Sequence, residues 1–178
     1  MKRLWMVMLG VFTLFLQGCS SMNVDDFKGQ GPTLVLEEYF QGTTYAHGLF
    51  QDRFGNVKRQ FTVNIEGTYQ EGTLTLVEDF VYNDGETDQR IWRITPGKDG
   101  YYTGTAGDVV GQAEGYVRGN ALNWRYTMDL AVGDTSYKVA FDDWMFLQQN
   151  GVMINKATVS KWGFRVGEVI LFFSKHPQ

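Results

Sequence analysis

Residues 119–136 read Gly-Asn-Ala-Leu-Asn-Trp-Arg-Tyr-Thr-Met-Asp-Leu-Ala-Val-Gly-Asp-Thr-Ser. Glycine-led dipeptides bound a run in which apolar and polar residues alternate. The apolar face consists of Leu122, Trp124, Tyr126, Met128 and Leu130. Such alternation is typical of a half-buried strand, and Gly-Asn and Gly-Asp supply the positive φ that two-residue hairpin turns need. The stretch therefore predicts an antiparallel strand with a hairpin at each end.

The same pattern repeats along the chain from residue 33. Turn signals separate short candidate strands, among them Gly55-Asn56, Glu71-Gly72, Asp84-Gly85, Asp99-Gly100, Gly133-Asp134 and Asn150-Gly151. No window holds a helical period over three turns. We predict ten or eleven strands that end at residue 174, the first of them with Leu34, Leu36, Glu38 and Phe40 on one face.

An all-β chain of sequential hairpins needs an arrangement without long open edges. A single antiparallel up-and-down β-barrel of about ten strands removes the edges by closure, and a two-sheet β-sandwich is the alternative. A transmembrane barrel would need a lipid-facing apolar row on every strand. Residues 101–106 and 113–118 lack such a row, so a barrel in water is favoured over one in a bilayer.

The composition excludes several classes of protein. Lys and Arg number 16 against 20 Asp and Glu, for a net charge of −4, so we expect no nucleic-acid partner. A hydrophobic content of 43% is incompatible with intrinsic disorder. Cys19 is the single cysteine, which excludes an intrachain disulfide framework and a thiolate metal cluster. We expect neither a metal nor a cofactor.

The first 18 residues have the features of an export signal. Lys2 and Arg3 precede the apolar residues 4–16, which are too few to cross a bilayer but suit a signal peptide. Residues 16–19, Leu-Gln-Gly-Cys, resemble a bacterial lipobox, in which the cysteine is acylated and becomes the first mature residue. An ordinary secretory signal followed by an unrelated cysteine is the alternative. We predict a lipoprotein signal peptide at 1–18, an acylated Cys19 with a flexible tether at 19–32, and a β-barrel domain at 33–178.

Ser20 follows the cysteine, where lipoproteins retained in the inner membrane have Asp. By this resemblance, palmitate and further acyl chains on Cys19 should anchor the chain in the outer membrane, on its periplasmic face. Loss of Lys2 and Arg3 with the signal leaves a more acidic mature chain, so we expect no electrostatic attraction to anionic lipid. The sequence identifies no protein partner.

Six candidate strands carry one ionisable residue on an otherwise apolar row. These residues are Glu38, His47, Glu78, Arg90, Asp143 and Glu168. If the alternation holds, they point into the barrel, where a buried charge needs a partner. Alternatively, strand ends or bulges near residues 78–79 and 142–143 turn them outward.

Five residues on these rows are candidates for binding a ligand: His47, Arg90, Trp92, Trp124 and Tyr126. Arg90 is a long cation whose planar guanidinium can hold a carboxylate through two hydrogen bonds. That carboxylate belongs either to a fatty-acid-like ligand or to Glu78 or Asp143 of the barrel itself.

No catalytic residue is predicted. His47 and His176 are the only histidines, and neither belongs to a nucleophile motif. The acidic residues 83–88 lack the spacing of a calcium loop. The glycine-rich residues 104–111 open no helix, so we interpret them as bends of the sheet.

Four stretches resemble a known family. They are residues 78–87 (Glu-Asp-Phe-Val-Tyr-Asn-Asp-Gly-Glu-Thr), 121–126 (Ala-Leu-Asn-Trp-Arg-Tyr), 141–145 (Phe-Asp-Asp-Trp-Met) and 163–173 (Gly-Phe-Arg-Val-Gly-Glu-Val-Ile-Leu-Phe-Phe). The family is a group of small Gram-negative lipoproteins known only as a domain of unknown function, and the resemblance covers about residues 19–175. It implies no activity and no catalytic residues. At the level of the fold alone, the barrel is similar to the lipocalins of the calycin class, although their Gly-x-Trp signature is absent near residue 33.

These observations favour a non-enzymatic, outer-membrane-anchored periplasmic lipoprotein whose barrel binds or shields a small apolar or amphipathic molecule. The alternative is a structural or adaptor lipoprotein that binds an envelope protein through the outer face of a solid barrel. A lipid-modifying enzyme is a third hypothesis, for which the sequence offers no motif.

Overall fold

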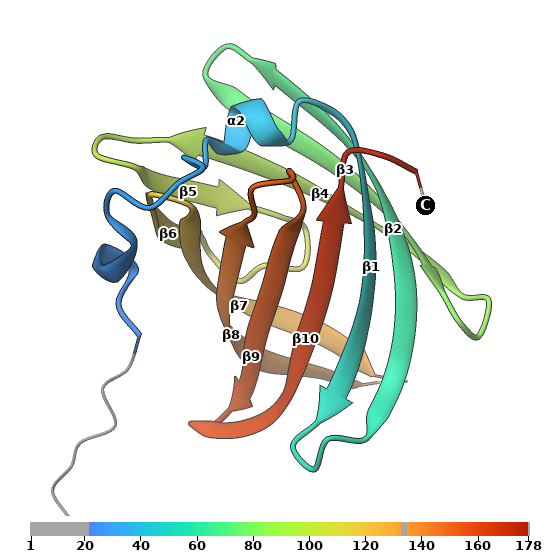
Figure 1. Cartoon of the computed structure of the whole chain (residues 1–178). Coiled ribbons are helices and arrows are strands. Elements are labelled where there is room, and N and C mark those ends of the chain that lie inside the picture. The colour runs from blue at the N-terminus through green and yellow to red at the C-terminus, as the bar shows by residue number, and fades with distance from the viewer. Residues whose placement is uncertain (1–21, 133–134, 178) are drawn as a thin grey trace, which may run out of the picture.

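The computed structural model describes residues 22–132 and 135–177. Ten antiparallel strands follow one another around a closed barrel (Figure 1). Their bounds are β1 Gly42–Asp52, β2 Val57–Gln70, β3 Thr73–Tyr82, β4 Thr87–Pro96, β5 Tyr101–Thr105, β6 Ala113–Arg118, β7 Ala121–Val132, β8 Thr135–Leu147, β9 Met153–Lys161 and β10 Phe164–Ser174. The up-and-down barrel predicted from the sequence is confirmed.

Pairing of the first and last strands closes the barrel. β1 pairs with β2 on one side, with Ala46 opposite Val63, and with β10 on the other, with Ala46 opposite Phe173. The three side chains are buried and belong to one apolar cluster. All ten strands and the buried clusters lie within residues 34–174, so the chain from residue 22 onward contains the whole barrel and its core.

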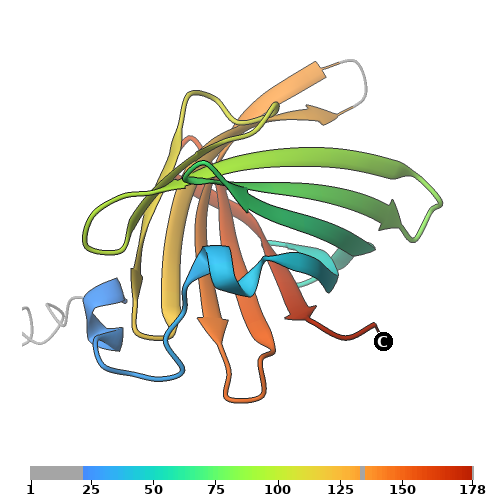
Figure 2. The same cartoon turned by 90° about the horizontal axis from the view of Figure 1, so that it is seen from above.

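A short helix replaces the first of the expected strands. The apolar residues at 34–40 suggested alternation, but Leu36–Tyr39 form helix α2, with Glu37 and Glu38 in its first turn, where the helix dipole favours acids. Leu36 and Phe40 are buried, whereas Glu38 is exposed. In Figures 1 and 2, α2 lies across the upper end of the barrel. The expectation of a strand here is wrong because one helical turn buries both apolar side chains inside that end.

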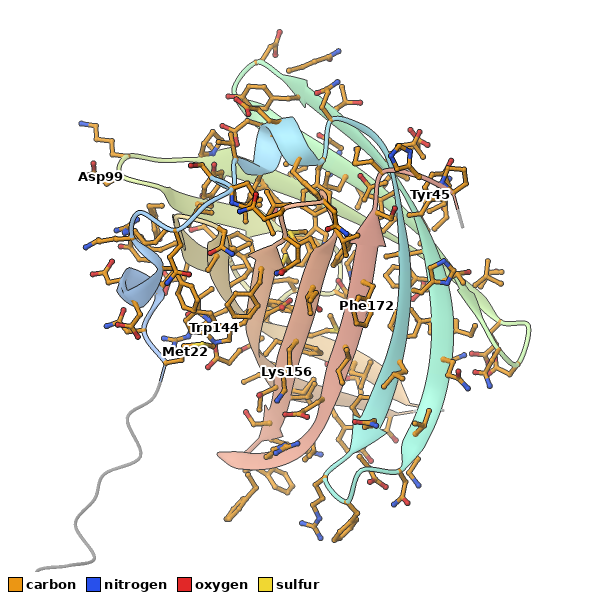
Figure 3. All side chains as sticks on the ribbon, in the orientation of Figure 1. Met22, Tyr45, Asp99, Trp144, Lys156 and Phe172 are labelled. Atoms are coloured by element: carbon orange, nitrogen blue, oxygen red, sulfur yellow. The ribbon has the colours of Figure 1, made fainter. Side chains whose placement is uncertain are left out.

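Residues 23–30 lie against the outside of the barrel. Asn23 caps the 3₁₀ helix η2 (Val24–Phe27), and the ring of Phe27 lies 5.3 Å from that of Phe146. Asp25 also forms an ion pair with Arg118. Part of the segment expected to be a tether therefore packs on β6 and β8, as Figure 3 shows near Trp144. Cys19 and the signal segment lie outside the described residues.

No helix among residues 22–132 and 135–177 is both long and apolar enough to span a bilayer.

Gly67 of β2 permits the close approach of the segment that closes the upper end. A Cβ at this position would lie 1.8 Å from the carbonyl oxygen of Phe40. We expect Gly67→Ala to lower the free energy of unfolding by about 2–3 kcal/mol, because the backbone has to move. Urea denaturation of residues 22–178 measures the change. Gly107, where a Cβ would meet no atom within 4 Å, provides the control Gly107→Ala. Equal effects of the two substitutions would contradict the packing described here.

Candidate functional site

A cavity of about 590 Å³ occupies the barrel interior. Inward-facing side chains from eight of the ten strands line it, all except β5 and β6, together with Leu36 and Phe40 at the α2 helix. Its wall is mainly apolar and aromatic, including Phe61, Phe80, Trp92, Trp124, Tyr126, Met128, Phe141 and Phe173. The solid-barrel alternative is therefore not supported by this interior.

Aromatic rings form one wall of the cavity. Trp92 of β4 contacts both Trp124 and Tyr126 of β7 edge to face, with ring centroids 5.9 and 5.4 Å apart. The ring of Tyr126 in turn stacks on that of Phe141 at 4.8 Å. Trp124 fits because the facing positions are glycines: a Cβ on Gly115 would lie 2.9 Å from its indole ring. These rings fix a rigid surface against which a flat or chain-like molecule can pack.

A bidentate ion pair lies at the side of the cavity. The Arg90 guanidinium donates from Nε and Nη2 to Asp108 Oδ2, at 2.9 and 2.7 Å. Asp108 lies in the loop between the short strands β5 and β6, and its carbonyl accepts from the Asp129 amide at 2.8 Å. β5 and β6 lie between β4 and β7 but are shorter than both. Beyond their ends, the ion pair and this loop connect β4 to β7.

Glu78 of β3 faces the same guanidinium. It is directly opposite Arg90 in the β3–β4 register and lines the cavity. Burial raises the pKa of Glu78 to about 7, although the charge of Arg90 opposes this rise. Burial also disfavours the charged form of Arg90, but Glu78 and Asp108 outweigh it and raise the Arg90 pKa. Arg90 therefore stays charged at neutral pH, while Glu78 is divided between its protonated and ionised forms.

Asp143 of β8 is a second acid in the cavity. Its side chain is 5% exposed and accepts a hydrogen bond from Asn155 of β9, which is itself buried. Burial raises the pKa of Asp143 to about 7; the Asn155 hydrogen bond opposes the rise, and the nearby carboxylates Asp142 and Glu78 add to it. Two carboxyl groups whose pKa values are raised toward neutral pH thus share the interior with the Arg90 guanidinium.

Four of the five candidate ligand-binding residues line the cavity: Arg90, Trp92, Trp124 and Tyr126. The inward position expected for His47 is wrong, because Thr44 and Ala46 occupy the inward positions of β1 and His47 is exposed on the outer face. Glu168 also lies outward, because the register shifts between Arg165 and Gly167. The role of the four lining residues in binding remains a prediction.

Sequence reasoning missed several polar residues at the site: Asp108, Asn155, and Arg59 and Glu86, which also line the cavity. Asp108 was interpreted as part of a sheet bend, and nothing in its glycine-rich surroundings indicates that the loop turns toward Arg90. Asn155 had a usable signal, because it interrupts the apolar row formed by Met153, Ala157 and Val159. As a neutral amide, Asn155 lacks the charge that distinguishes the other interruptions of such rows.

The fold and the interior together define a ten-stranded up-and-down β-barrel with a largely apolar internal cavity. Residues 13–175 match the family described as protein of unknown function (DUF3833). The chain belongs to this family. A comparison with curated proteins found no match.

The two buried acids make stability depend on pH. Both have a higher pKa in the folded than in the unfolded chain, so the folded state binds protons more tightly. The contribution of these two acids to stability is therefore greatest at low pH and falls as the pH rises from about 4 through 7. Between pH 5 and pH 8 we expect the free energy of unfolding to fall by roughly 2 kcal/mol for each acid.

Chemical denaturation of residues 22–178 at several pH values measures this dependence. Glu78→Gln and Asp143→Asn should each remove part of the slope and stabilise the barrel at pH 8. Glu38→Gln, which changes an exposed carboxyl group on α2, is the control and should retain the wild-type slope. Stability that is constant or rises between pH 5 and pH 8 would contradict the buried positions of the two acids.

Proposed function

We propose that the protein is a lipid-anchored envelope protein whose barrel binds a small apolar or amphipathic molecule without catalysing a reaction. The observation that carries the proposal is the internal cavity of about 590 Å³, with a mainly apolar wall into which β3, β4, β8 and β9 place polar groups. Small-molecule sites in proteins are typically concave, mostly apolar and about 300–1,000 Å³ in volume.

The apolar wall favours a ligand with an alkyl or acyl chain. The lining runs from Leu36 and Phe40, at the two ends of α2, to Leu130 and Val166 toward the opposite end of the barrel, so the apolar surface is elongated along the barrel. Each methylene group that leaves water for such a surface contributes about 0.8 kcal/mol. A single chain of fatty-acid type matches both the apolar character and the volume of the cavity.

The polar groups favour a head group that is neutral or cationic. Asp108 already occupies Nε and Nη2 of Arg90, so these two nitrogens are not free to hold a ligand carboxylate in a fork. Glu78 and Asp143 add negative charge as they ionise, and they can accept hydrogen bonds from a hydroxyl, amine or amide. A fatty acid would bind best in its protonated form. The sequence predicts a fatty-acid-like ligand, and the polar lining favours one whose head group is neutral or cationic.

The lipid anchor is supported by the sequence. Cys19 ends the lipobox-like residues 16–19 and is three positions before Met22, where the described chain begins. Acyl chains on Cys19 would therefore hold the barrel close to a membrane. The Ser20 residue favours the outer membrane, and its periplasmic face is the proposed location.

A comparison of single-chain ligands tests the cavity. We expect brominated alkyl alcohols and amines to quench tryptophan fluorescence of residues 22–178 at pH 8, because Trp92 and Trp124 line the cavity. A brominated fatty acid of equal length should bind about tenfold more weakly at pH 8, a difference of about 1.4 kcal/mol. The acid should approach the alcohol in affinity at pH 5, where the carboxyl groups take up protons.

Two substitutions on one strand separate cavity binding from adhesion to the surface. Ala157 of β9 is buried against the cavity, and its neighbour Lys156 is exposed on the outer face. Ala157→Phe should fill part of the cavity and abolish quenching, whereas Lys156→Phe should leave it unchanged. Absence of quenching by every ligand, or equal quenching in the two variants, would refute a binding cavity.

Replacement of the single cysteine tests the anchor. We expect Cys19→Ala to abolish incorporation of labelled palmitate, because the acceptor sulfur is lost, and to prevent maturation of the lipoprotein. Ser20→Asp should keep the label but move the protein from outer-membrane to inner-membrane fractions of a sucrose gradient. Wild-type protein without label would contradict the lipoprotein assignment.

A further inference from the structure

Two neighbouring turns at the lower end of the barrel expose large aromatic side chains. The β1–β2 turn exposes Phe54, and the β9–β10 turn exposes Trp162 and Phe164, which are 74%, 87% and 74% exposed. The turns lie side by side, since the Arg53 amide donates to the Val166 carbonyl at 3.0 Å. Figure 1 shows both turns at the end opposite to α2. We call their residues, 53–58 and 161–165, the tip surface.

The conformation of the β9–β10 turn does not require a tryptophan at position 162. Trp162 and Gly163 have φ angles of 53° and 81°, the left-handed pair that a two-residue hairpin turn requires. Glu71-Gly72 and Asp99-Gly100 adopt the same conformation elsewhere in the barrel, so a small or polar residue can fill the position. A bulky aromatic residue is disfavoured in this region of φ, and its side chain is exposed to water, which points to a role outside the fold.

Cations accompany these rings. The tip surface contains Arg53, Lys58, Lys161 and Arg165 and no acidic residue, although the whole chain has a net charge of −4. The Arg53 guanidinium lies 4.7 Å from the Phe54 ring centroid, and Lys161 Nζ lies 4.6 Å from that of Trp162. Acids beside the tip surface offset two of its cations, because Asp52 pairs with Lys58 and Glu168 pairs with Arg165.

We propose that the tip surface docks onto a lipid bilayer that contains anionic lipids. Exposed Trp and Phe side chains partition into the interface between headgroups and acyl chains, and adjacent Lys and Arg side chains attract anionic headgroups. The net negative charge of the chain predicts no attraction to anionic lipid. The local charge of the tip surface differs, because its cations are gathered beside the aromatic rings.

The tip surface is continuous with the cavity wall. Phe50 of β1 is opposite Val169 of β10 in the register, and both line the cavity together with Val166. Docking would therefore place the lower end of the cavity at the bilayer, where an amphipathic ligand could enter from the lipid. This consequence rests on the proposed function, whereas docking itself does not.

Binding of residues 22–178, which lack the acylated cysteine, to vesicles tests the proposal. We expect co-sedimentation with vesicles of roughly three parts phosphatidylcholine to one part phosphatidylglycerol, and weaker binding to phosphatidylcholine alone. The double variant Trp162→Ala, Phe164→Ala should bind the mixed vesicles at least about tenfold more weakly. Circular dichroism confirms that the variants fold.

Phe172 provides the matched control, because it is 50% exposed on the outer wall of β10, away from the tip surface (Figure 3). Phe172→Ala should bind vesicles like the wild type, and so should Ala157→Phe, which blocks only the cavity. Absence of binding to the mixed vesicles would overturn the proposal, as would equal binding by the Trp162 and Phe164 double variant. Self-association that the double variant abolishes, without vesicle binding, would instead assign the tip surface to a second copy of the chain.

Discussion

The number of strands is the constraint on which the rest of the structure depends. A barrel of about eight strands has an interior that side chains can fill. This barrel closes with ten strands, through the pairing of β1 with β10, and its circumference is correspondingly larger. The α2 segment fills the upper end with Leu36 and Phe40, and the remaining interior is the cavity. The cavity is thus a consequence of closure, and the residues on its wall decide what it can hold.

The charged groups on that wall lose hydration when they are buried. For each of them, an ion pair, a hydrogen bond or protonation lowers this desolvation cost. Arg90 is compensated by a bidentate contact with Asp108. Asp143 accepts a hydrogen bond from Asn155 and, like Glu78, has a raised pKa that allows it to become neutral. An all-apolar wall of similar volume would be at least as stable. The polar groups are therefore better understood as determinants of which head group the cavity accepts.

Much of the fold could be predicted from the sequence because hairpin turns and alternation are local. The row from Leu122 to Leu130 and the positions of Glu78, Arg90 and Asp143 follow from period two alone. The faces of His47 and Glu168 were predicted wrongly: the row around His47 is ambiguous, and a bulge before Glu168 reverses the faces of β10. Residues 34–40 do not form the predicted strand, because they close one end of the barrel with a helical turn instead of joining the sheet. Asp108 could not be predicted, since its contact with Arg90 depends on how a loop folds back onto β7.

Native mass spectrometry of the barrel, extracted gently from its own membrane, tests the central claim most directly. If the cavity is a binding site for an apolar or amphipathic molecule, the wild-type protein should retain a small molecule of lipid-like mass. The Ala157→Phe variant should have the mass of the mature acylated chain alone. A wild-type protein that never carries an additional molecule, under conditions in which it remains folded, would contradict the account.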